Sequence, residues 1–190
     1  MSFNIVRNNI VNVSADAIVN TANPKPIVGN GTDSAIYNKA GYNRLLQERK
    51  KIGDIEVGKA AITPAFDLNA KYIIHTVGPI YIDGLHHEKD DLRSCYKESI
   101  KLAKKYKCKS IAFPLISTGV YGFPKDEALD IAIDECEKNS KGIDVTLVVF
   151  DRDSLGISLK VLDDVKEFIN SKSVEEELIK EYGLEYANDE

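Results

Sequence analysis

The feature that most constrains the fold of this chain is the stretch from Ala15 to Gly41, where a buried strand passes through a glycine-containing loop into a helix. Ala17-Ile18-Val19 is the short apolar run typical of a buried strand. A helix is expected from about Ser34 to Ala40, with Gly41 as its C-terminal cap. Because open α/β sheets bind ligands at the carboxyl ends of their strands, the loop between this strand and this helix is a candidate binding site.

The loop itself carries polar and turn-forming residues in close succession. Asn20 and Asn23 bracket the end of the strand, and Asp33 stands at the start of the helix. The Gly29-Asn30-Gly31 segment lets the backbone turn where side chains would clash, and a helix N-terminus that follows glycines favours an anion. Two purely structural interpretations stay open: Asp33 caps the helix, and Gly29-Asn30-Gly31 is an ordinary turn.

A second stretch, from Phe113 to Pro124, repeats the arrangement. A hydrophobic strand over Ser110 to Ile116 runs into the small residues Ser117-Thr118-Gly119, and a helix is expected from about Lys125 to Glu137. Small residues leave backbone N–H groups free to form a concave nest for phosphate oxygens, and Tyr121 offers a flat face beside it. The sequence contains neither a Walker loop nor a G-x-G-x-x-G dinucleotide fingerprint. Two such loops in a short chain predict one extended ligand held between them.

Composition narrows the class of protein and its partners. A chain of 190 residues with 43% hydrophobic and 29% charged residues suits one globular domain with a real core. The net charge of −5 argues against an extended grip on nucleic-acid backbone, so nucleic acid is not expected as the main partner. Cys95, Cys108 and Cys136 stand at unrelated spacings and are expected to be reduced, mostly buried thiols. The sequence shows no signal peptide and no membrane-spanning run, which predicts a cytoplasmic location and no membrane partner.

The three histidines do not form a recognisable metal site. His75 lies in an apolar strand and is expected to be a hydrogen-bonded structural residue. His86 and His87 are adjacent in a polar loop with no third ligand at a spacing typical of zinc sites. Exposed histidines are therefore favoured over a metal site, and no metal is predicted.

Strands that alternate with helices along the rest of the chain predict a three-layer α/β/α sandwich. Further strands are expected at Phe3 to Val6 (as an edge strand), Val57 to Thr63, Lys71 to Val77 and Val145 to Phe150, and further helices at Tyr42 to Lys51, Glu88 to Lys107 and Leu159 to Ile169. Arg49 is expected on the solvated face of its helix. We divide the chain into a domain over 1–170 and an acidic extension over 171–190, for which a last helix is favoured over a frayed tail.

Four motifs in one order resemble a known family. They are DAIVNTAN, GNGTD, the segment HTVGPIY from His75 to Tyr81, and ISTGVYGFP. Together they look like a macrodomain, and most like the branch that includes mono-ADP-ribosyl hydrolases and O-acetyl-ADP-ribose deacetylases. The resemblance covers about Asn4 to Asn170 and implies a six-stranded mixed sheet in an α/β/α sandwich.

The resemblance also implies a role for individual residues. Asp33 would lie near the anomeric carbon of the distal ribose of ADP-ribose and position or deprotonate a water, while Asn23 would bond the hydroxyls of that ribose. The loop after Ile116 would hold the diphosphate, and Phe150 would lie near adenine. The implied catalytic residues are thus Asp33 and Asn23, and the implied ligand-binding residues are Asn9, Ile10, Asn20, Gly29, Asn30, Gly31, Ser117, Thr118, Gly119, Val120, Tyr121, Gly122 and Phe150. No cofactor and no metal is implied.

Two functions of different classes follow from this resemblance. One is an enzyme that hydrolyses ADP-ribose esters, either on acidic side chains of ADP-ribosylated proteins or in O-acetyl-ADP-ribose. The other is a reader module that binds ADP-ribose without turnover. Asn23 together with Asp33 favours the enzyme.

The chain departs from the family pattern at four places. Asn9 stands where an aspartate binds the adenine amino group, and Asn30 stands where many relatives have glycine. Tyr37-Asn38 stands where relatives often carry His-Arg, and Thr21 stands where they have alanine.

Overall fold

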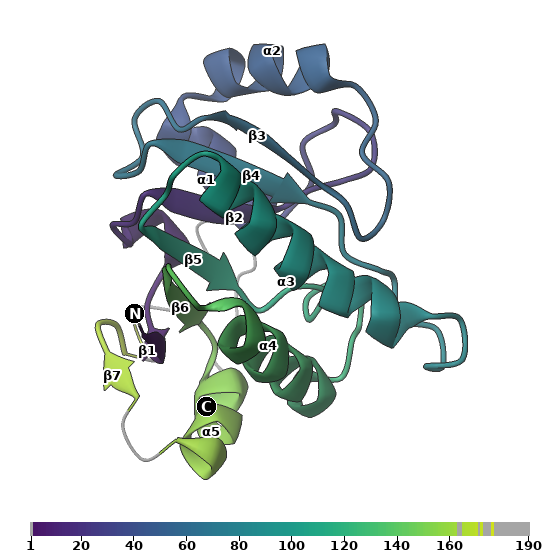
Figure 1. The fold of residues 1–190 in the computed structure, drawn as a ribbon, viewed down its shortest axis with the longest axis vertical. Coiled ribbons are helices and arrows are strands. Elements are labelled where there is room, and N and C mark those ends of the chain that lie inside the picture. The colour runs from purple at the N-terminus through teal and green to yellow at the C-terminus, as the bar shows by residue number, and fades with distance from the viewer. Residues whose placement is uncertain (1, 163–164, 171, 173–175, 177–190) are drawn as a thin grey trace, which may run out of the picture.

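A sheet of seven strands forms the middle layer of the computed structural model, which describes residues 2–162 and 165–170 together with Lys172 and Glu176 (Figure 1). The strand order is β3-β4-β2-β5-β6-β1-β7, and every neighbouring pair is parallel except β3 and β4. The strands are β1 (Phe3–Arg7), β2 (Ala17–Thr21), β3 (Ala60–Pro64), β4 (Tyr72–Thr76), β5 (Ser110–Pro114), β6 (Asp144–Val149) and β7 (Lys166–Glu167). The mixed sheet is as expected, with the two-residue β7 as a strand beyond the six that the resemblance implies.

Helices cover both faces of the sheet and complete the three-layer sandwich (Figure 1). They are η1 (Ile10–Asn12), α1 (Thr32–Ala40), α2 (Tyr42–Ile52), α3 (Glu88–Lys105), α4 (Lys125–Asn139) and α5 (Arg152–Val161). The first three pack on one face, and α3, α4 and α5 pack on the other. In the part of the chain that the structure describes, no helix has the length and apolar character needed to cross a bilayer.

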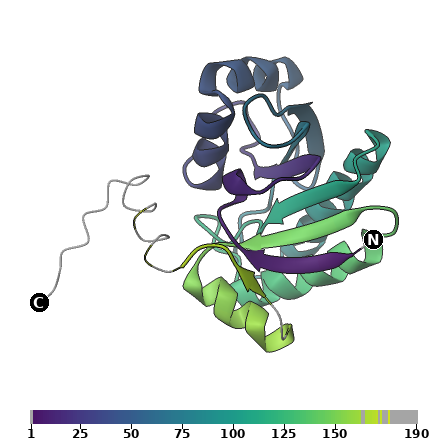
Figure 2. The ribbon, with the colours of Figure 1, turned by 90° about the vertical axis from the view of Figure 1, so that its left-hand side faces the viewer.

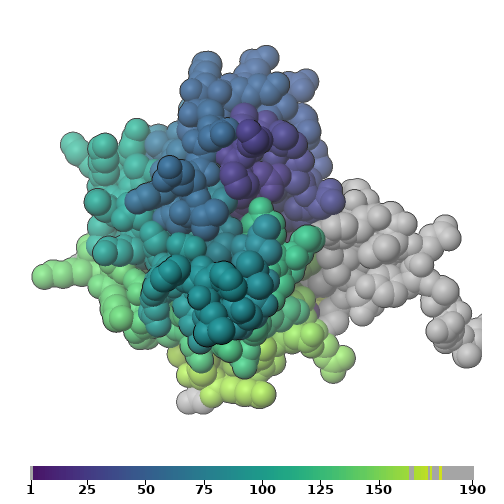
Figure 3. All heavy atoms as spheres, turned by 90° about the vertical axis from the view of Figure 1, so that its right-hand side faces the viewer, coloured from purple at the N-terminus to yellow at the C-terminus, as the bar shows by residue number. Residues whose placement is uncertain are grey.

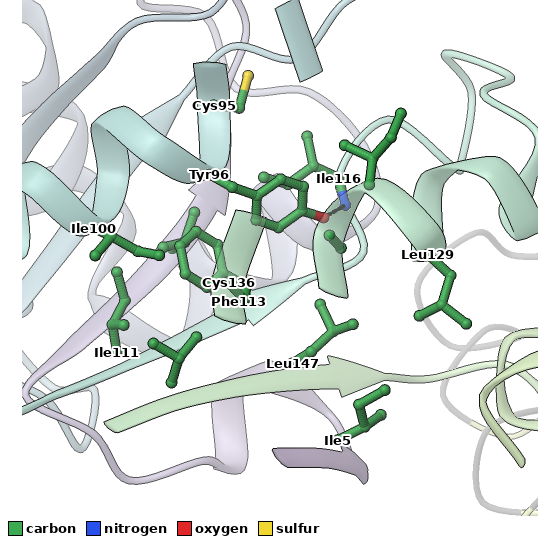
Figure 4. Close-up of a cluster of buried hydrophobic side chains, with 14 of the residues drawn as sticks. Ile5, Cys95, Tyr96, Ile100, Ile111, Phe113, Ile116, Leu129, Cys136 and Leu147 are labelled. Carbon is green, nitrogen blue, oxygen red and sulfur yellow. Dashed lines mark hydrogen bonds between the residues drawn. The ribbon is translucent and has the colours of Figure 1, made fainter. Parts of the chain in front are cut away.

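The alternation of side chains along the strands explains why both faces are covered. On β6, Val145 and Leu147 point into the core beneath α3 and α4, whereas Val148 joins the core beneath α1. Strands with apolar residues on both sides need helices on both sides. Figure 4 shows the larger core, in which the Tyr96 ring of α3 lies 5.0 Å from the Phe113 ring of β5, centroid to centroid.

The end of the described chain departs from expectation. The helix expected at Leu159 to Ile169 instead begins at Arg152, because the Asp151 side chain caps it by accepting a 3.0 Å hydrogen bond from the Ser154 N–H. The chain then returns to the sheet as β7, which lies beside β1 (Figure 2). Phe3–Val6 is therefore not an edge strand over its full length. The extension over 171–190, expected as a last helix, lies outside the described residues apart from Lys172 and Glu176.

Two further expectations about single elements need correction. The strand expected at Val57 to Thr63 is shorter and begins at Ala60. Arg49, expected on the solvated face of α2, has only 1% of its surface exposed. The three cysteines are all free thiols and all buried, as expected.

Candidate functional site

A cavity of about 470 Å³ opens at the carboxyl ends of β1, β2, β5 and β6. Parallel strands place these four ends at one edge of the sheet, so the loops that follow them meet there. The site residues expected from the sequence that line this cavity are Asn9, Ile10, Asn23, Gly29, Asn30, Gly31, Asp33, Ser117, Thr118, Gly119, Val120, Tyr121 and Phe150. The other two expected residues do not line it: Asn20 lies behind Asp33 with 0% of its surface exposed, and Gly122 lies just beyond Tyr121.

The loop after β5 forms a concave row of backbone donors. Ser117 adopts a positive φ of 66°, which turns the chain, and the loop closes through a 2.9 Å hydrogen bond from the Phe123 N–H to the Ser117 carbonyl. The N–H groups of residues 117 to 121 find no acceptor within the described part of the chain. A Cβ added at Gly119 would meet no atom within 4 Å. This row of free N–H groups around open space is an anion nest.

Two contacts from the rest of the fold hold this loop in place. The Ile116 N–H donates a 3.1 Å hydrogen bond to the buried Tyr96 hydroxyl of α3 (Figure 4). On its other side the loop lies against Gly78, where an added Cβ would stand 2.1 Å from the Ser117 Oγ. Gly78 lines the cavity and was not expected as a site residue from the sequence; its signal is its place two residues after β4, in the HTVGPIY motif.

Asp33 is a buried carboxylate at the wall of the cavity, with 4% of its surface exposed. It is the second residue of α1 and not its cap, because Gly31 occupies the N-cap position. One carboxylate oxygen accepts from the Asn20 amide at 2.6 Å, and the other accepts from the Gly29 N–H at 2.7 Å. An asparagine at 33 would set its NH₂ group against one of these donors, so the position selects a carboxylate. Burial raises the pKa of Asp33, and the two hydrogen bonds and Arg49 oppose that rise.

A chain of buried side chains behind Asp33 orients Asn20. The Asn20 amide nitrogen lies 3.2 Å from the His75 Nδ1, and the His75 Nε2 lies 3.0 Å from the Thr63 hydroxyl. Thr63 donates its only proton to the Pro64 carbonyl, so it accepts from Nε2–H and leaves Nδ1 as the acceptor for Asn20. Burial lowers the pKa of His75 to about 3, which keeps the ring neutral. The expectation of a hydrogen-bonded structural histidine is confirmed.

The loop after β2 meets the loop after β5 directly over the cavity. The Tyr121 hydroxyl donates a 3.3 Å hydrogen bond to the Asn23 Oδ1, and the Asn23 amide donates to the Ile27 carbonyl at 2.8 Å. Beyond Asn23, the N–H groups of residues 30 to 33 find no acceptor in the described residues, which leaves the start of α1 open to an anion or to sugar hydroxyls. Figure 3 shows the loop after β2, in purple, on the same face of the molecule as α2, in blue.

Another end of the cavity is lined by residues of η1 and β6 and by the residues that follow β1 and β6. The Asn9 side-chain oxygen caps η1 by accepting a 3.2 Å hydrogen bond from the Val11 N–H, and Phe150 lines the wall that follows β6. Lys125 and Asp151 also line this end and form a 2.8 Å ion pair. Neither was expected from the sequence, although the Asp151-x-x-Ser154 spacing of a helix cap is a signal for Asp151.

Outside this cavity, the side chains of Asp83, His86 and Glu88 lie close enough together to be considered as ligands of a metal ion. Both Glu88 oxygens accept hydrogen bonds from backbone N–H groups of the loop that precedes α3. These bonds hold the pKa of Glu88 at about 2 against the opposing effect of burial. The Glu88 carboxylate thus serves to order its own loop.

The Macro domain family model matches residues 19–132. The chain is 44% identical to a macro domain-containing protein of Methanosarcina mazei, with 85% of this chain and 88% of that protein covered. It is 41% identical to O-acetyl-ADP-ribose deacetylase 2 of Pantoea vagans, with 84% and 97% covered. It is also 47% identical to human ADP-ribose glycohydrolase MACROD2 over 68% of this chain and 30% of that protein.

Solved structures give the same picture of the fold. The Oceanobacillus iheyensis macrodomain with ADP superposes with a TM-score of 0.76 at 31% identity, covering 93% of this chain and 90% of that one. The Trypanosoma brucei macrodomain in complex with ADP-ribose superposes with a TM-score of 0.77 at 33% identity, covering 84% and 68%.

Proposed function

The chain belongs to the Macro domain family, and from that premise we propose that it binds ADP-ribose and hydrolyses ADP-ribose esters. The substrates proposed are proteins mono-ADP-ribosylated on acidic side chains and O-acetyl-ADP-ribose. The relatives named as a deacetylase and as a glycohydrolase support the hydrolase. The neighbours described with ADP and with ADP-ribose support the ligand.

The observation that carries the proposal is the pairing of an anion nest with a buried carboxylate in one cavity. The free N–H groups of residues 117 to 121 suit the two phosphates of ADP-ribose, whose charge needs fixed donors. Phe150 and Asn9 are at the end that we assign to adenosine. The distal ribose then falls between Tyr121 and Asn23, next to Asp33.

The proposed reaction depends on the fixed orientation of the Asp33 carboxylate. Hydrolysis of an ester at the distal ribose needs a water aimed at the bond that breaks, and a carboxylate can orient that water or take its proton. Two N–H donors on separate oxygens hold the Asp33 carboxylate in one orientation. In this proposal the Asn23 amide, which accepts from the Tyr121 hydroxyl, binds the ribose hydroxyls and so fixes the sugar relative to the water.

The experiment that tests the proposal separates turnover from binding. Proteins mono-ADP-ribosylated on glutamate, and separately on serine or arginine, are incubated with the full chain and free ADP-ribose is measured, with O-acetyl-ADP-ribose as a fourth substrate. Calorimetry with ADP-ribose is run on the same preparation. Release from glutamate or from the acetyl ester supports the hydrolase. Binding without release from any substrate favours the reader module, and the absence of binding refutes both.

A further inference from the structure

Arg49 is a buried cation that no element of the mechanism has yet used. It lies on α2 with 1% of its surface exposed. Its guanidinium donates to the carbonyls of Asn23 at 3.1 Å and Pro24 at 3.2 Å, and its other terminal nitrogen donates to Gly53. A planar fork with five donors can hold several carbonyls at once, which an ammonium does less well. Arg49 thus clamps the backbone of the loop that carries Asn23.

The charge of Arg49 lacks a direct ion-pair partner in the described residues. On the same helix, Arg44 pairs with Asp67 and Lys51 pairs with Glu48, both near the surface. Carbonyls solvate a buried guanidinium but do not neutralise it, and an uncompensated buried charge is costly. Burial lowers the pKa of Arg49, and the carboxylates that oppose this are Asp33 and Asp54. Asp54 is exposed and pairs with Lys25, whereas Asp33 is buried. Burial raises the pKa of Asp33 in turn, and Arg49 opposes that rise together with the two hydrogen bonds that Asp33 accepts.

The other groups around Asp33 carry no compensating positive charge. His75 is buried and neutral, and Asn20 is an amide. Burial and the nearby Asp33 raise the pKa of the Tyr37 hydroxyl on α1, and the same two causes raise the pKa of the Tyr121 hydroxyl, so both phenols stay neutral. Among these neighbours of Asp33, Arg49 is therefore the residue whose positive charge favours the ionised form of the Asp33 carboxylate.

We propose that Arg49 is a positioning residue of this site: it clamps the Asn23–Pro24 backbone, and its buried positive charge adds to the hydrogen bonds that favour the ionised form of Asp33. Its kinetic part rests on the proposed hydrolase. Arg49 touches neither the cavity nor the substrate and acts through Asn23 and Asp33. A buried carboxylate is otherwise driven toward its neutral form, which cannot accept the proton of a water.

The test uses the full chain with Arg49→Gln, Arg49→Lys and the control Arg44→Gln, which removes a positive charge from the exposed side of the same helix. The titration of the Asp33 carboxyl carbon is followed by NMR, assigned with Asp33→Ala. Arg49→Gln is expected to move the Asp33 midpoint upward and to lower kcat by about 10–100-fold, the loss that follows at metal sites when a group that orients a ligand is removed. Arg49→Lys is expected to leave the midpoint near that of the wild type while still lowering kcat. Arg44→Gln is expected to change neither.

The titration of Asp33 can be measured without any turnover. It therefore tests the role of Arg49 even if the protein does not hydrolyse ADP-ribose esters. A folded Arg49→Gln protein with a wild-type Asp33 midpoint overturns the proposal, and so does an equal shift in Arg44→Gln. If Arg49→Gln does not fold, the wild-type protein decides: the Arg49 Nε resonance is expected to titrate with the Asp33 midpoint. An Arg49 resonance that stays fixed through that midpoint overturns the coupling.

Discussion

Replacement of Gly78 by alanine tests how the anion nest is supported. An added Cβ would stand 2.1 Å from the Ser117 Oγ and 2.8 Å from the Ile116 Cγ2, so the loop after β5 must move. Overpacking of this kind costs about 1–3 kcal/mol. Because Ile116 is anchored to Tyr96, the displacement falls mainly on Ser117 and the free N–H groups after it. If this free energy is lost from the binding of ADP-ribose, the affinity for ADP-ribose falls by about 5–150-fold.

The assay is calorimetry with ADP-ribose beside a thermal melting curve. Gly156→Ala is the control, since a Cβ at Gly156 in α5 meets nothing within 4 Å. The double variant Gly78→Ala with Ser117→Gly removes the Oγ contact, and glycine also suits the positive φ of position 117. It is expected to recover most of the affinity, leaving the Ile116 contact. Wild-type affinity in a folded Gly78→Ala protein would show that the nest does not depend on this close approach.

Three further substitutions probe the remaining parts of the site. Gly119→Glu should abolish ADP-ribose binding with an unchanged melting curve, since a Cβ there enters open space but the carboxylate enters the nest; calorimetry showing unchanged affinity would move the diphosphate elsewhere. Asp33→Ala should lower single-turnover hydrolysis by about 10²–10⁴-fold with little change in affinity, and the wild-type rate should fall as the pH drops through the raised pKa of Asp33; wild-type turnover in the variant would refute the catalytic role. Asn9→Asp preserves the cap on η1 and should tighten ADP-ribose binding by about 1 kcal/mol while weakening the inosine analogue; an unchanged ratio of the two dissociation constants would show that Asn9 does not face the base.

The sequence by itself determined the layers of the fold and two loops that line the cavity. The apolar runs of β2, β5 and β6 are local signals of buried parallel strands, and helical patterns between them demand helices on both faces. The glycines and small residues around Asn30 and Gly119 act through backbone freedom, which is also local. Since strand ends meet by topology, the two loops could be placed together before the structure was known.

The tertiary structure decided what depends on partners far along the chain. Arg49 has the sequence context of a solvated helix face, and only the approach of the Asn23–Pro24 backbone makes it a buried clamp. Asn20 carries the same chemical groups as Asn23, but the pairing of β2 with β4 sets it against His75 and away from the cavity. The strand β7 forms where it pairs with Val6 and Arg7 of β1, and its own two residues carry no strand signal. Local propensity acts within a few residues, whereas burial, pKa and hydrogen-bond partners are set by whichever distant segment packs nearby.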